Sequence, residues 1–423
     1  MREQGWARGD YALAFVHSPS AKLSLSVGYA FTHDEAQVHV FEGNDSVSPA
    51  HQFNAITVVE PGRTLELGDQ VIRVTKGEEQ AGLAGLDALV ETLELGPPED
   101  SPASVHEGGL YEFHPWGRLE MWHQGDRGMR YPRLTELMPY YQRLGMKTLW
   151  VLPVSWPPPW VYTLPEFDRV APENGSPEEL KAMVAAAHAH EMRQLIDLVV
   201  YGTRPDSSEV AKLPPEVWCR DEAGNPVLVW GNSVQAADCS NPLWQQRITE
   251  VISHWRDEYG FDGTRLDCIG WGQTVNWANP DRASDAVAYG GLQLNKVIRD
   301  GFREGNPDGV TLPEGGKPLV FTNSDLLFDY PLYLAMRDLT GQPDLAKWVA
   351  DTQEWLQLEG IGYPNRGVNG LVRFLQNHDV VEPSDFFGVG LSQALQALIT
   401  FIPGVPMVYQ EQEIGRASCR ERV

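Results

Sequence analysis

The sequence predicts an α/β protein in which a small all-β domain precedes a parallel β-sheet flanked by helices. Residues 1–100 contain short segments of alternating apolar and polar residues, separated by Gly, Pro and Asp. Residues 101–109 fall in a stretch rich in Pro, Ser, Gly and acidic residues, as is typical of a linker. In residues 110–413, apolar strand-like runs alternate with helix-like segments, which implies a parallel sheet that is either open or closed.

The first hundred residues are expected to form a β-sandwich-like domain. In AKLSLSVGYAF, Leu23, Leu25 and Val27 alternate with small residues, the pattern of a half-buried strand. The same pattern returns in QVHVFEGND, ITVVEPGRTLELGDQ and VIRVTKGEE. Each segment stops at Gly, Pro or Asp, so we expect short antiparallel strands joined by turns.

Repeated strand and helix signals follow the linker. LTELMPYYQRLGMKTLWVLPV pairs a helix that ends near Gly145 with an apolar strand. SPEELKAMVAAAHAH opens with Ser176 as an N-cap and Glu179 three residues later, which is a capping box. RQLIDLVVYG is the next strand, and the helix TEVISHWRDEYG leads into the strand GFDGTRLD. Units of this length are typical of parallel sheets.

The composition of the 423 residues, 42% hydrophobic and 22% charged, is that of a soluble globular protein. A net charge of −25 argues against a nucleic-acid partner, because phosphates would be repelled. We find neither a membrane span nor a signal peptide in the sequence and expect a cytoplasmic location. Cys219, Cys239 and Cys268 are too scattered for a disulfide framework or a metal site, and the oligomeric state stays open.

Two short stretches place polar side chains at the ends of apolar segments. In GFDGTRLDCIG, Arg265 and Asp267 are two residues apart, so on a strand they point to the same side. In FLQNHD, Asn377, His378 and Asp379 follow an apolar approach. Structural strands with ordinary polar ends would explain either stretch alone. Together and in this order, they resemble the second and fourth conserved regions of the α-amylase family of glycoside hydrolases.

The resemblance covers most of residues 110–413 and implies a closed (β/α)8 TIM barrel, with its active site at the carboxyl ends of the strands. LGMKTLWVLPV, QLIDLVV and GVPMVYQEQ are similar to the second, third and eighth strands of the family. The family usually continues with a last helix and a β-sandwich domain. Here a basic tail, IGRASCRERV (414–423), resembles a translated sequencing adapter, so we expect a barrel that is missing its last helix.

The resemblance further implies a retaining hydrolase or transglycosylase that acts on an α-glucan or oligosaccharide through a covalent glycosyl intermediate. Asp267 would be the nucleophile, and Arg265 would keep its carboxylate ionised and oriented. Asp379 would bind sugar hydroxyls and stabilise the transition state. His378 and Asn377 would take part in binding the substrate beside it.

The general acid has two candidate positions. NPDGVTLPEGG ends at Glu314 in the order of the family's third region. PLVFTNSD is the better strand by propensity, and as the fifth strand it would place Asn323 or Asp325 at the acid position. Because FDYPLYLAM follows Asp325 too closely for another strand–helix connection, we favour Glu314. The alternative is that Glu314 is a solvated loop residue.

Other positions depart from the family pattern. Where the first region ordinarily ends in Asn-His, this chain has Tyr201-Gly202, although the supporting Asp197 is present. The missing Asn ordinarily helps to hold a structural calcium, which would therefore lack one of its usual ligands, and we expect no cofactor. Trp271 stands where a His is common, and with Tyr201 it is a candidate substrate-binding residue. These changes indicate an unusual substrate or a decayed site.

The aromatic segment SWPPPWVYTLPEFD lies where family members build substrate loops. Trp156, Trp160 and Tyr162 would form stacking surfaces for sugars or pack as a rigid loop against the barrel. His114 is interpreted as a core or rim histidine. The alternative function is a catalytically silent module for carbohydrate binding or protein interaction. The two functions differ in whether Glu314 lies on the barrel face that carries Asp267 and Asp379.

Overall fold

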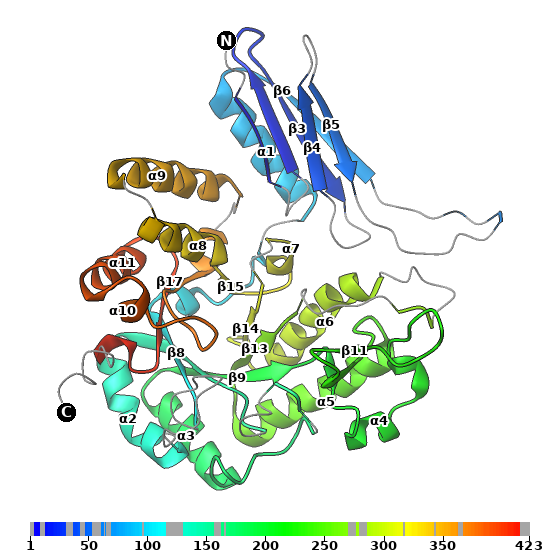
Figure 1. Cartoon of the computed structure of the whole chain (residues 1–423), viewed down its shortest axis with the longest axis vertical. Helices are drawn as coiled ribbons and strands as arrows, with labels where there is room; N and C mark the ends of the chain where they lie inside the picture. Colours follow the sequence, from blue (N-terminus) through cyan, green and yellow to red (C-terminus); the bar gives the residue numbers. More distant parts are fainter. Residues whose placement is uncertain are drawn as a thin grey trace.

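A computed structural model gives the fold of most of the chain. It describes residues 4–8, 13–30, 37–42, 47–52, 61–62, 64, 69–94, 97–115, 130–155, 162–164, 166–269, 276–278, 286–315, 318–341, 344–362 and 367–414. The described residues form an N-terminal antiparallel part and a barrel, which are drawn above and below one another in Figure 1. None of the described helices is long and apolar enough to cross a membrane.

The N-terminal part is an antiparallel sheet covered on one face by a helix. The sheet has the order β1-β2-β3-β6, with bounds Gln4–Arg8, Leu13–Ser18, Leu23–Ala30 and Asp69–Lys76. Strands β4 (Gln37–Glu42) and β5 (Val47–Gln52) form a second, two-stranded sheet. Helix α1 (Glu79–Thr92) packs against β3 and β6. Antiparallel sheets were expected here, whereas the helix was not predicted.

Small side chains allow α1 to approach the sheet closely. A Cβ atom on Gly82 would lie 2.0 Å from Ser24 Oγ, and one on Gly85 would lie 2.2 Å from Thr75 Oγ1. Ser24 and Ser26 are consequently buried beneath the helix side of β3. The serines that alternate with the apolar residues of this strand are therefore part of the packing and do not face solvent.

The second part is an eight-stranded parallel barrel, which confirms the expected fold class. The barrel strands are joined in the order β14-β13-β9-β8-β7-β17-β16-β15. The gap between β14 and β15 is closed by the amides of Asp325 and Leu326, which donate to the carbonyl of Thr311 at 3.2 and 3.0 Å. The bounds of the barrel strands, in chain order, are β7 Gly109–Phe113, β8 Met146–Val151, β9 Arg193–Val199, β13 Gly263–Asp267, β14 Val310–Pro313, β15 Leu327–Phe328, β16 Leu371–Arg373 and β17 Val405–Tyr409.

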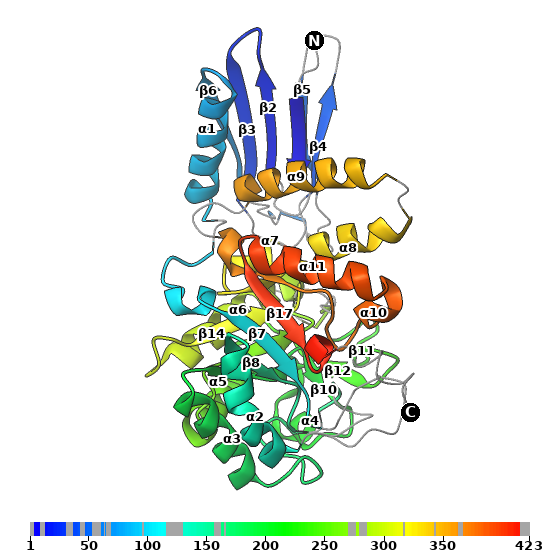
Figure 2. The same cartoon turned by 90° about the vertical axis from the view of Figure 1, so that its left-hand side faces the viewer.

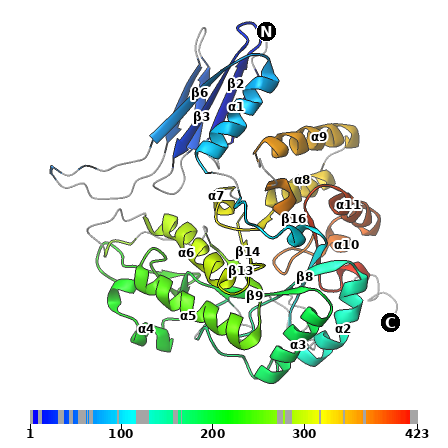
Figure 3. The same ribbon diagram turned by 180° about the vertical axis from the view of Figure 1, so that it is seen from behind.

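Helices pack around the outside of the barrel. Figure 3 shows α2 beside α3 and α5 beside α6, and each pair is in contact. The capping box predicted for α3 is confirmed: Ser176 Oγ accepts from the Glu179 amide, and Glu179 accepts from the Ser176 amide. The helix bounds are α2 Tyr131–Arg143, α3 Pro177–Ala189, α4 Ser208–Lys212, α5 Pro242–Tyr259, α6 Ala286–Arg303, α7 Pro318–Phe321, α8 Tyr330–Asp338, α9 Leu345–Gly362, α10 Pro383–Phe386 and α11 Val389–Phe401.

A small inserted sheet lies between β9 and α5. It consists of β10 (Gly202–Thr203), β12 (Val234–Ala236) and β11 (Leu228–Val229), paired antiparallel in that order. Because the insertion follows directly after β9, it starts at the carboxyl end of a barrel strand. Figure 2 shows β10 and β12 below the ends of β7 and β17. The insertion is thus placed where parallel barrels carry their active sites.

The structure decides which segment forms the fifth strand. Residues 310–313 form β14, with Pro313 in register with Leu266, whereas PLVF is the short helix α7. Glu314 therefore directly follows the carboxyl end of β14. Asp325 precedes β15 and so lies at the opposite, amino end of the barrel. The alternative in which Asn323 or Asp325 occupies the acid position is wrong.

Candidate active site

A buried arginine at the carboxyl end of the barrel binds three carboxylates. Arg265 on β13 is 1% exposed. Its Nη1 lies 3.1 Å from an Asp197 oxygen and 2.8 Å from an Asp267 oxygen, and its Nη2 lies 2.8 Å from Glu314 Oε2. Asp197 is the register partner of Arg265 on β9. Four predicted site residues from three adjacent strands are thus brought together.

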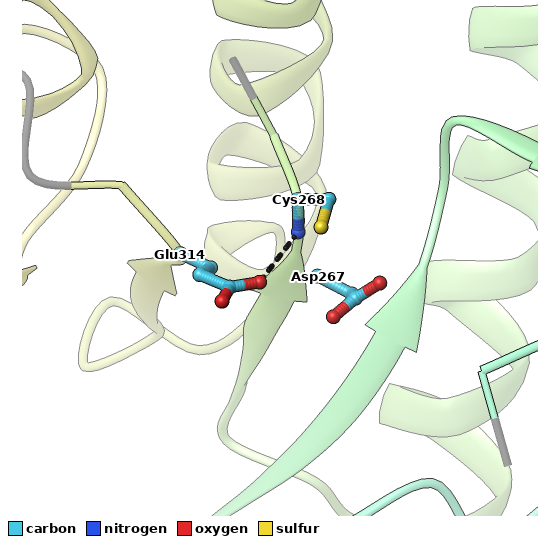
Figure 4. A group of neighbouring side chains, drawn as sticks. All are labelled: Asp267, Cys268 and Glu314. Atoms are coloured by element: carbon cyan, nitrogen blue, oxygen red, sulfur yellow. Dashed lines mark hydrogen bonds between the residues drawn. The ribbon is translucent and has the colours of Figure 1, made fainter. Parts of the chain in front are cut away.

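Asp267 and Glu314 face each other across a short gap (Figure 4). One carboxylate oxygen of each, together with the Cys268 sulfur, lies in a group whose atoms are all within 4.8 Å of one another. Both side chains are largely buried, and Glu314 Oε2 also accepts a hydrogen bond from the Cys268 amide at 3.0 Å. The left-handed backbone of Cys268, with φ of 48°, turns its amide toward Glu314 as the chain leaves β13.

His378 is the centre of a second buried cluster. Its Nδ1 lies 2.6 Å from Glu112 Oε1, and its Nε2 lies 2.7 Å from the Tyr162 hydroxyl and 3.3 Å from Asp379 Oδ2. The Tyr162 hydroxyl donates to Asp197 Oδ2 at 3.1 Å. Tyr162 and Asp197 therefore link the histidine cluster to the arginine cluster, and the site is one connected network.

The pKa values in this network are shifted by burial and by close charges. Burial alone would lower the pKa of His378, but the carboxylates of Asp379 and Glu112 outweigh it and raise that pKa to about 9. Burial raises the pKa of Glu112. Burial, together with the neighbouring carboxylates, also raises the pKa of Asp267 well above its ordinary value despite the contact with Arg265.

Glu314 is shifted in the opposite direction. Burial favours its neutral form, but Arg265 and the Cys268 amide stabilise the carboxylate and lower the pKa of Glu314. Asp267 and Glu314 therefore contact the same arginine, yet their pKa values are shifted in opposite directions.

The remaining predicted residues lie in and around the network. Asp379 is exposed at the mouth of the site, while Asn377 is buried and accepts from the Asp379 amide at 2.9 Å. Asn377 thus shapes the turn that presents Asp379. Both residues follow β16, which ends at Arg373, and lie beyond the strand itself. His114 is fully buried, as expected of a core histidine. Trp156, Trp160 and Trp271 lie outside the described residues.

Tyr201 lies near Asp267, a position that the sequence pattern did not predict. It is 3% exposed, and burial together with the nearby Asp267 carboxylate raises the pKa of its hydroxyl well above the ordinary value. A phenol in this position is a poor calcium ligand compared with an amide or carboxylate oxygen. Within the described part of the chain, the candidate metal-binding group is Asp267, Cys268 and Glu314. Arg265 already contacts both carboxylates, and a thiol favours softer metals than calcium, so this group does not fit a structural calcium.

Sequence reasoning missed Glu112. It lies on β7 with no exposed surface, and its second oxygen, Oε2, is buried without a hydrogen-bond partner. The signal was present, because LYEF places one charged residue inside an otherwise apolar strand. Its partner His378 is 266 residues away, so local pattern could not reveal what the carboxylate binds.

Comparisons with known proteins find similar sequences and similar structures. The family model of the α-amylase catalytic domain matches residues 132–213. Alpha-amylase 3 of Dictyoglomus thermophilum is 21% identical over 69% of this chain and 61% of its own length. Glucan 1,6-alpha-glucosidase of Streptococcus pneumoniae is 22% identical over 73% of this chain and 65% of its own length. The chain therefore spans less than two thirds of either curated relative.

Solved structures share the fold. A maltogenic α-amylase from Thermotoga neapolitana superposes with a TM-score of 0.59 at 22% identity, covering 73% of this chain and 69% of that one. An α-amylase from Lactobacillus plantarum gives a TM-score of 0.58 at 20% identity, covering 74% and 73%. The barrel, the family model matched over residues 132–213 and the curated relatives make this chain similar to proteins of the α-amylase family, at about 20% identity.

Proposed function

We propose that this chain carries the catalytic barrel of a retaining glycosidase or transglycosylase acting on α-glucosidic bonds. The observation that carries the proposal is the position of Asp267 and Glu314 on one barrel face, with carboxylate oxygens within 4.8 Å of each other. Retaining enzymes hold their two carboxyl groups about 5–5.5 Å apart, whereas inverting enzymes need a wider gap for a water molecule. The names of the curated relatives, an α-amylase and a glucan 1,6-α-glucosidase, support α-glucans as the substrate class.

In the proposed reaction, Asp267 attacks the anomeric carbon while Glu314 gives a proton to the departing glycosidic oxygen. The resulting glycosyl–Asp267 ester is then attacked by water or by a sugar hydroxyl, from which Glu314 removes the proton. Positive charge develops on the sugar ring in both transition states. The surplus of carboxylates over cations around the ring, with Asp379 at the mouth, would stabilise that charge.

Contacts of Asp267 and Glu314 with Arg265 suggest how Glu314 can be protonated before it acts as the acid. When Glu314 turns toward a glycosidic oxygen, it leaves Arg265 and the Cys268 amide, and its pKa rises because the stabilisation of its charge is lost. Arg265 then remains with Asp267, whose pKa falls correspondingly. Substrate binding would thereby favour the protonated form of Glu314 and the ionised form of Asp267.

The test uses Glu314→Gln and Asp267→Asn with two kinds of substrate. Glu314→Gln should lower the hydrolysis rate of maltoheptaose by about 10²–10⁴-fold. The same variant should lose far less on p-nitrophenyl α-glucoside, because nitrophenolate leaves without protonation. Asp267→Asn should abolish both reactions. Asp308→Asn, which changes an exposed carboxylate near the amino end of the barrel, is the matched control and should leave both rates unchanged.

Two results would contradict the proposed roles. Equal losses of Glu314→Gln on both substrates would exclude Glu314 as the acid, and activity of Asp267→Asn would exclude Asp267 as the nucleophile. A catalytically silent carbohydrate-binding module is the second candidate, favoured by the Tyr201 hydroxyl that occupies one side of Asp267. Binding of maltoheptaose in calorimetry without turnover of any α-glucoside would favour that second function.

A further inference from the structure

An exposed tryptophan stands at the tip of the inserted sheet. Trp230 follows β11 and precedes β12, in a hairpin of the insertion that follows β9. Its side chain is 51% exposed, whereas Trp150, Trp218, Trp244 and Trp255 are buried within the described part of the chain. The exposed indole therefore offers a flat apolar face to a ligand.

The backbone of this residue is strained. Trp230 has a φ of 53°, and Gly231 and Asn232 follow with φ of 65° and 69°. Gly and Asn tolerate this left-handed conformation, but a bulky residue adopts it at an energetic cost. The carbonyl of Trp230 is fixed by Ser233 Oγ, which donates to it at 2.6 Å. A strained residue held in place by its turn is a recurrent feature of ligand-binding positions.

Tyr201 lies between the ring of Trp230 and the proposed nucleophile, Asp267. The centroid of the Trp230 ring is 6.4 Å from the centroid of Tyr201, with an angle of 57° between the planes. Tyr201 follows β9, where Val199 is in register with Asp267, and the Asp267 carboxylate is close enough to contribute to the raised pKa of Tyr201. A sugar chain that places one glucose unit at Asp267 would therefore carry a further unit past Trp230. The flat face of an indole is suited to the apolar face of a pyranose ring.

We infer that Trp230 is a stacking platform for a glucose unit beyond the one that is cleaved. This inference rests on the proposed function and specifies its substrate class: linked glucose units, as in malto-oligosaccharides, in preference to a single glucoside. Tyr201 supports the platform from the side of the nucleophile. The hairpin between β11 and β12 thus contributes to substrate choice, while the barrel contributes the reacting groups.

The test removes the ring without straining the turn. Trp230→Asn suits the left-handed backbone, so the variant should fold at least as well as the parent chain in thermal melts. Its KM for maltoheptaose should rise by about three- to tenfold with kcat nearly unchanged, which is the size of one aromatic contact. Its KM for p-nitrophenyl α-glucoside should not change. Trp230→Phe should retain most of the binding.

Leu228→Ala is the matched control, because Leu228 is an exposed apolar residue of the same hairpin, 38% exposed. It should leave both KM values unchanged. An unaltered KM of Trp230→Asn for maltoheptaose, or an equal rise for both substrates, would overturn the inference while leaving the proposed function intact.

A failure of the proposed function gives a different result. If the parent chain turns over neither substrate, the platform is tested by calorimetry with maltoheptaose alone. Weaker binding by Trp230→Asn than by the parent chain would then support the platform in a non-catalytic site. Equal binding by the two proteins, or no binding by the parent chain, would overturn it.

Discussion

The barrel holds a cluster of cation–carboxylate pairs at each of its two ends, with a buried arginine in each, and the clusters differ in their charge balance. The carboxyl-end cluster contains two cations, Arg265 and His378, and five carboxyl groups: Glu112, Asp197, Asp267, Glu314 and Asp379. The amino-end cluster contains two of each charge: Arg299, Arg303, Asp100 and Asp325.

The amino-end cluster is saturated with hydrogen bonds. Asp325 Oδ1 accepts from Arg299, from Arg303 at 2.7 Å and from the hydroxyl of Ser101 at 2.7 Å. Its second oxygen accepts from the Thr311 amide at 3.0 Å. Since Ser101 belongs to the linker, this balanced cluster fastens the linker to α6 and to the start of β15.

The carboxyl-end cluster is unbalanced and incompletely satisfied. Glu112 keeps a buried oxygen without a hydrogen bond, Asp379 is exposed, and the pKa of Asp267 is raised by its crowded surroundings. Surplus negative charge is costly in the resting protein, and in the proposed reaction it would stabilise a positively charged sugar ring. Charge balance thus distinguishes an ion-pair cluster that stabilises the fold from one that would serve the proposed reaction.

Breaking the balanced cluster should have the largest effect on stability. Asp325→Asn leaves Arg299 and Arg303 without their buried anion, and we expect a loss of about 3–5 kcal/mol in the free energy of unfolding. Urea denaturation measures this loss. Rates of the folded fraction on maltoheptaose should stay near those of the parent chain, because the residue lies at the far end of the barrel.

Asp100→Asn is the control for this prediction. Asp100 pairs with the same two arginines, but its side chain is 66% exposed, so its removal should cost less than about 1 kcal/mol. If Asp325→Asn lowered kcat in protein that remains folded, the amino-end cluster would affect catalysis as well as stability, which contradicts the prediction.

The histidine of the unbalanced cluster should make stability depend on pH. The pKa of His378 rises from its ordinary 6.5 to about 9 in the folded chain, so the folded state binds this proton more tightly than the unfolded state. The resulting stabilisation, on the order of 3 kcal/mol at most, is complete below pH 6.5 and is lost as the pH rises through about 9. The melting temperatures of the parent chain and His378→Gln should therefore converge between pH 6.5 and 10.

His188→Gln provides the comparison at the amino end. His188 Nε2 also lies 2.8 Å from a carboxylate, that of Asp262, which raises the pKa of His188. The side chain of His188 is 42% exposed, so solvent screens the pair and the change with pH should be small. If the effect of His188→Gln on the melting temperature depended on pH as strongly as that of His378→Gln, burial would not explain the expected difference between the two histidines.

Much of the barrel could be predicted because its signals are local. The strands β8, β9 and β17 each contain a short apolar stretch, and the capping box of α3 lies within four residues. Arg265 and Asp267 share a face because side chains alternate along a strand. Their convergence with Asp379 follows from the rule that parallel strands end on one face of the barrel.

The rest depends on partners that are distant in sequence. Tyr162 contacts His378 across 216 residues, so the sequence showed an aromatic loop residue but not a buried hydroxyl that joins two clusters. The fifth strand was ambiguous because PLVF has the better strand propensity, while pairing with β13 selects residues 310–313. The helix α1 was missed although Leu86, Leu89 and Val90 follow helical spacing, because the neighbouring segments favoured strands.

The smallest predicted effect is the most direct test of charge imbalance. Asp267→Asn removes one carboxylate from the crowded cluster and keeps its shape, while Arg265 retains Asp197 and Glu314. We expect the free energy of unfolding at pH 7 to increase by about 1 kcal/mol, since sites arranged for reaction commonly sacrifice stability. Because the pKa of Asp267 is raised in the folded chain, the parent carboxyl gains its own proton as the pH falls. The difference in the free energy of unfolding between Asp267→Asn and the parent chain, measured by urea denaturation, should accordingly shrink toward pH 4. A variant that is less stable than the parent chain at pH 7 would mean that the ion pair with Arg265 outweighs the repulsion among the carboxylates.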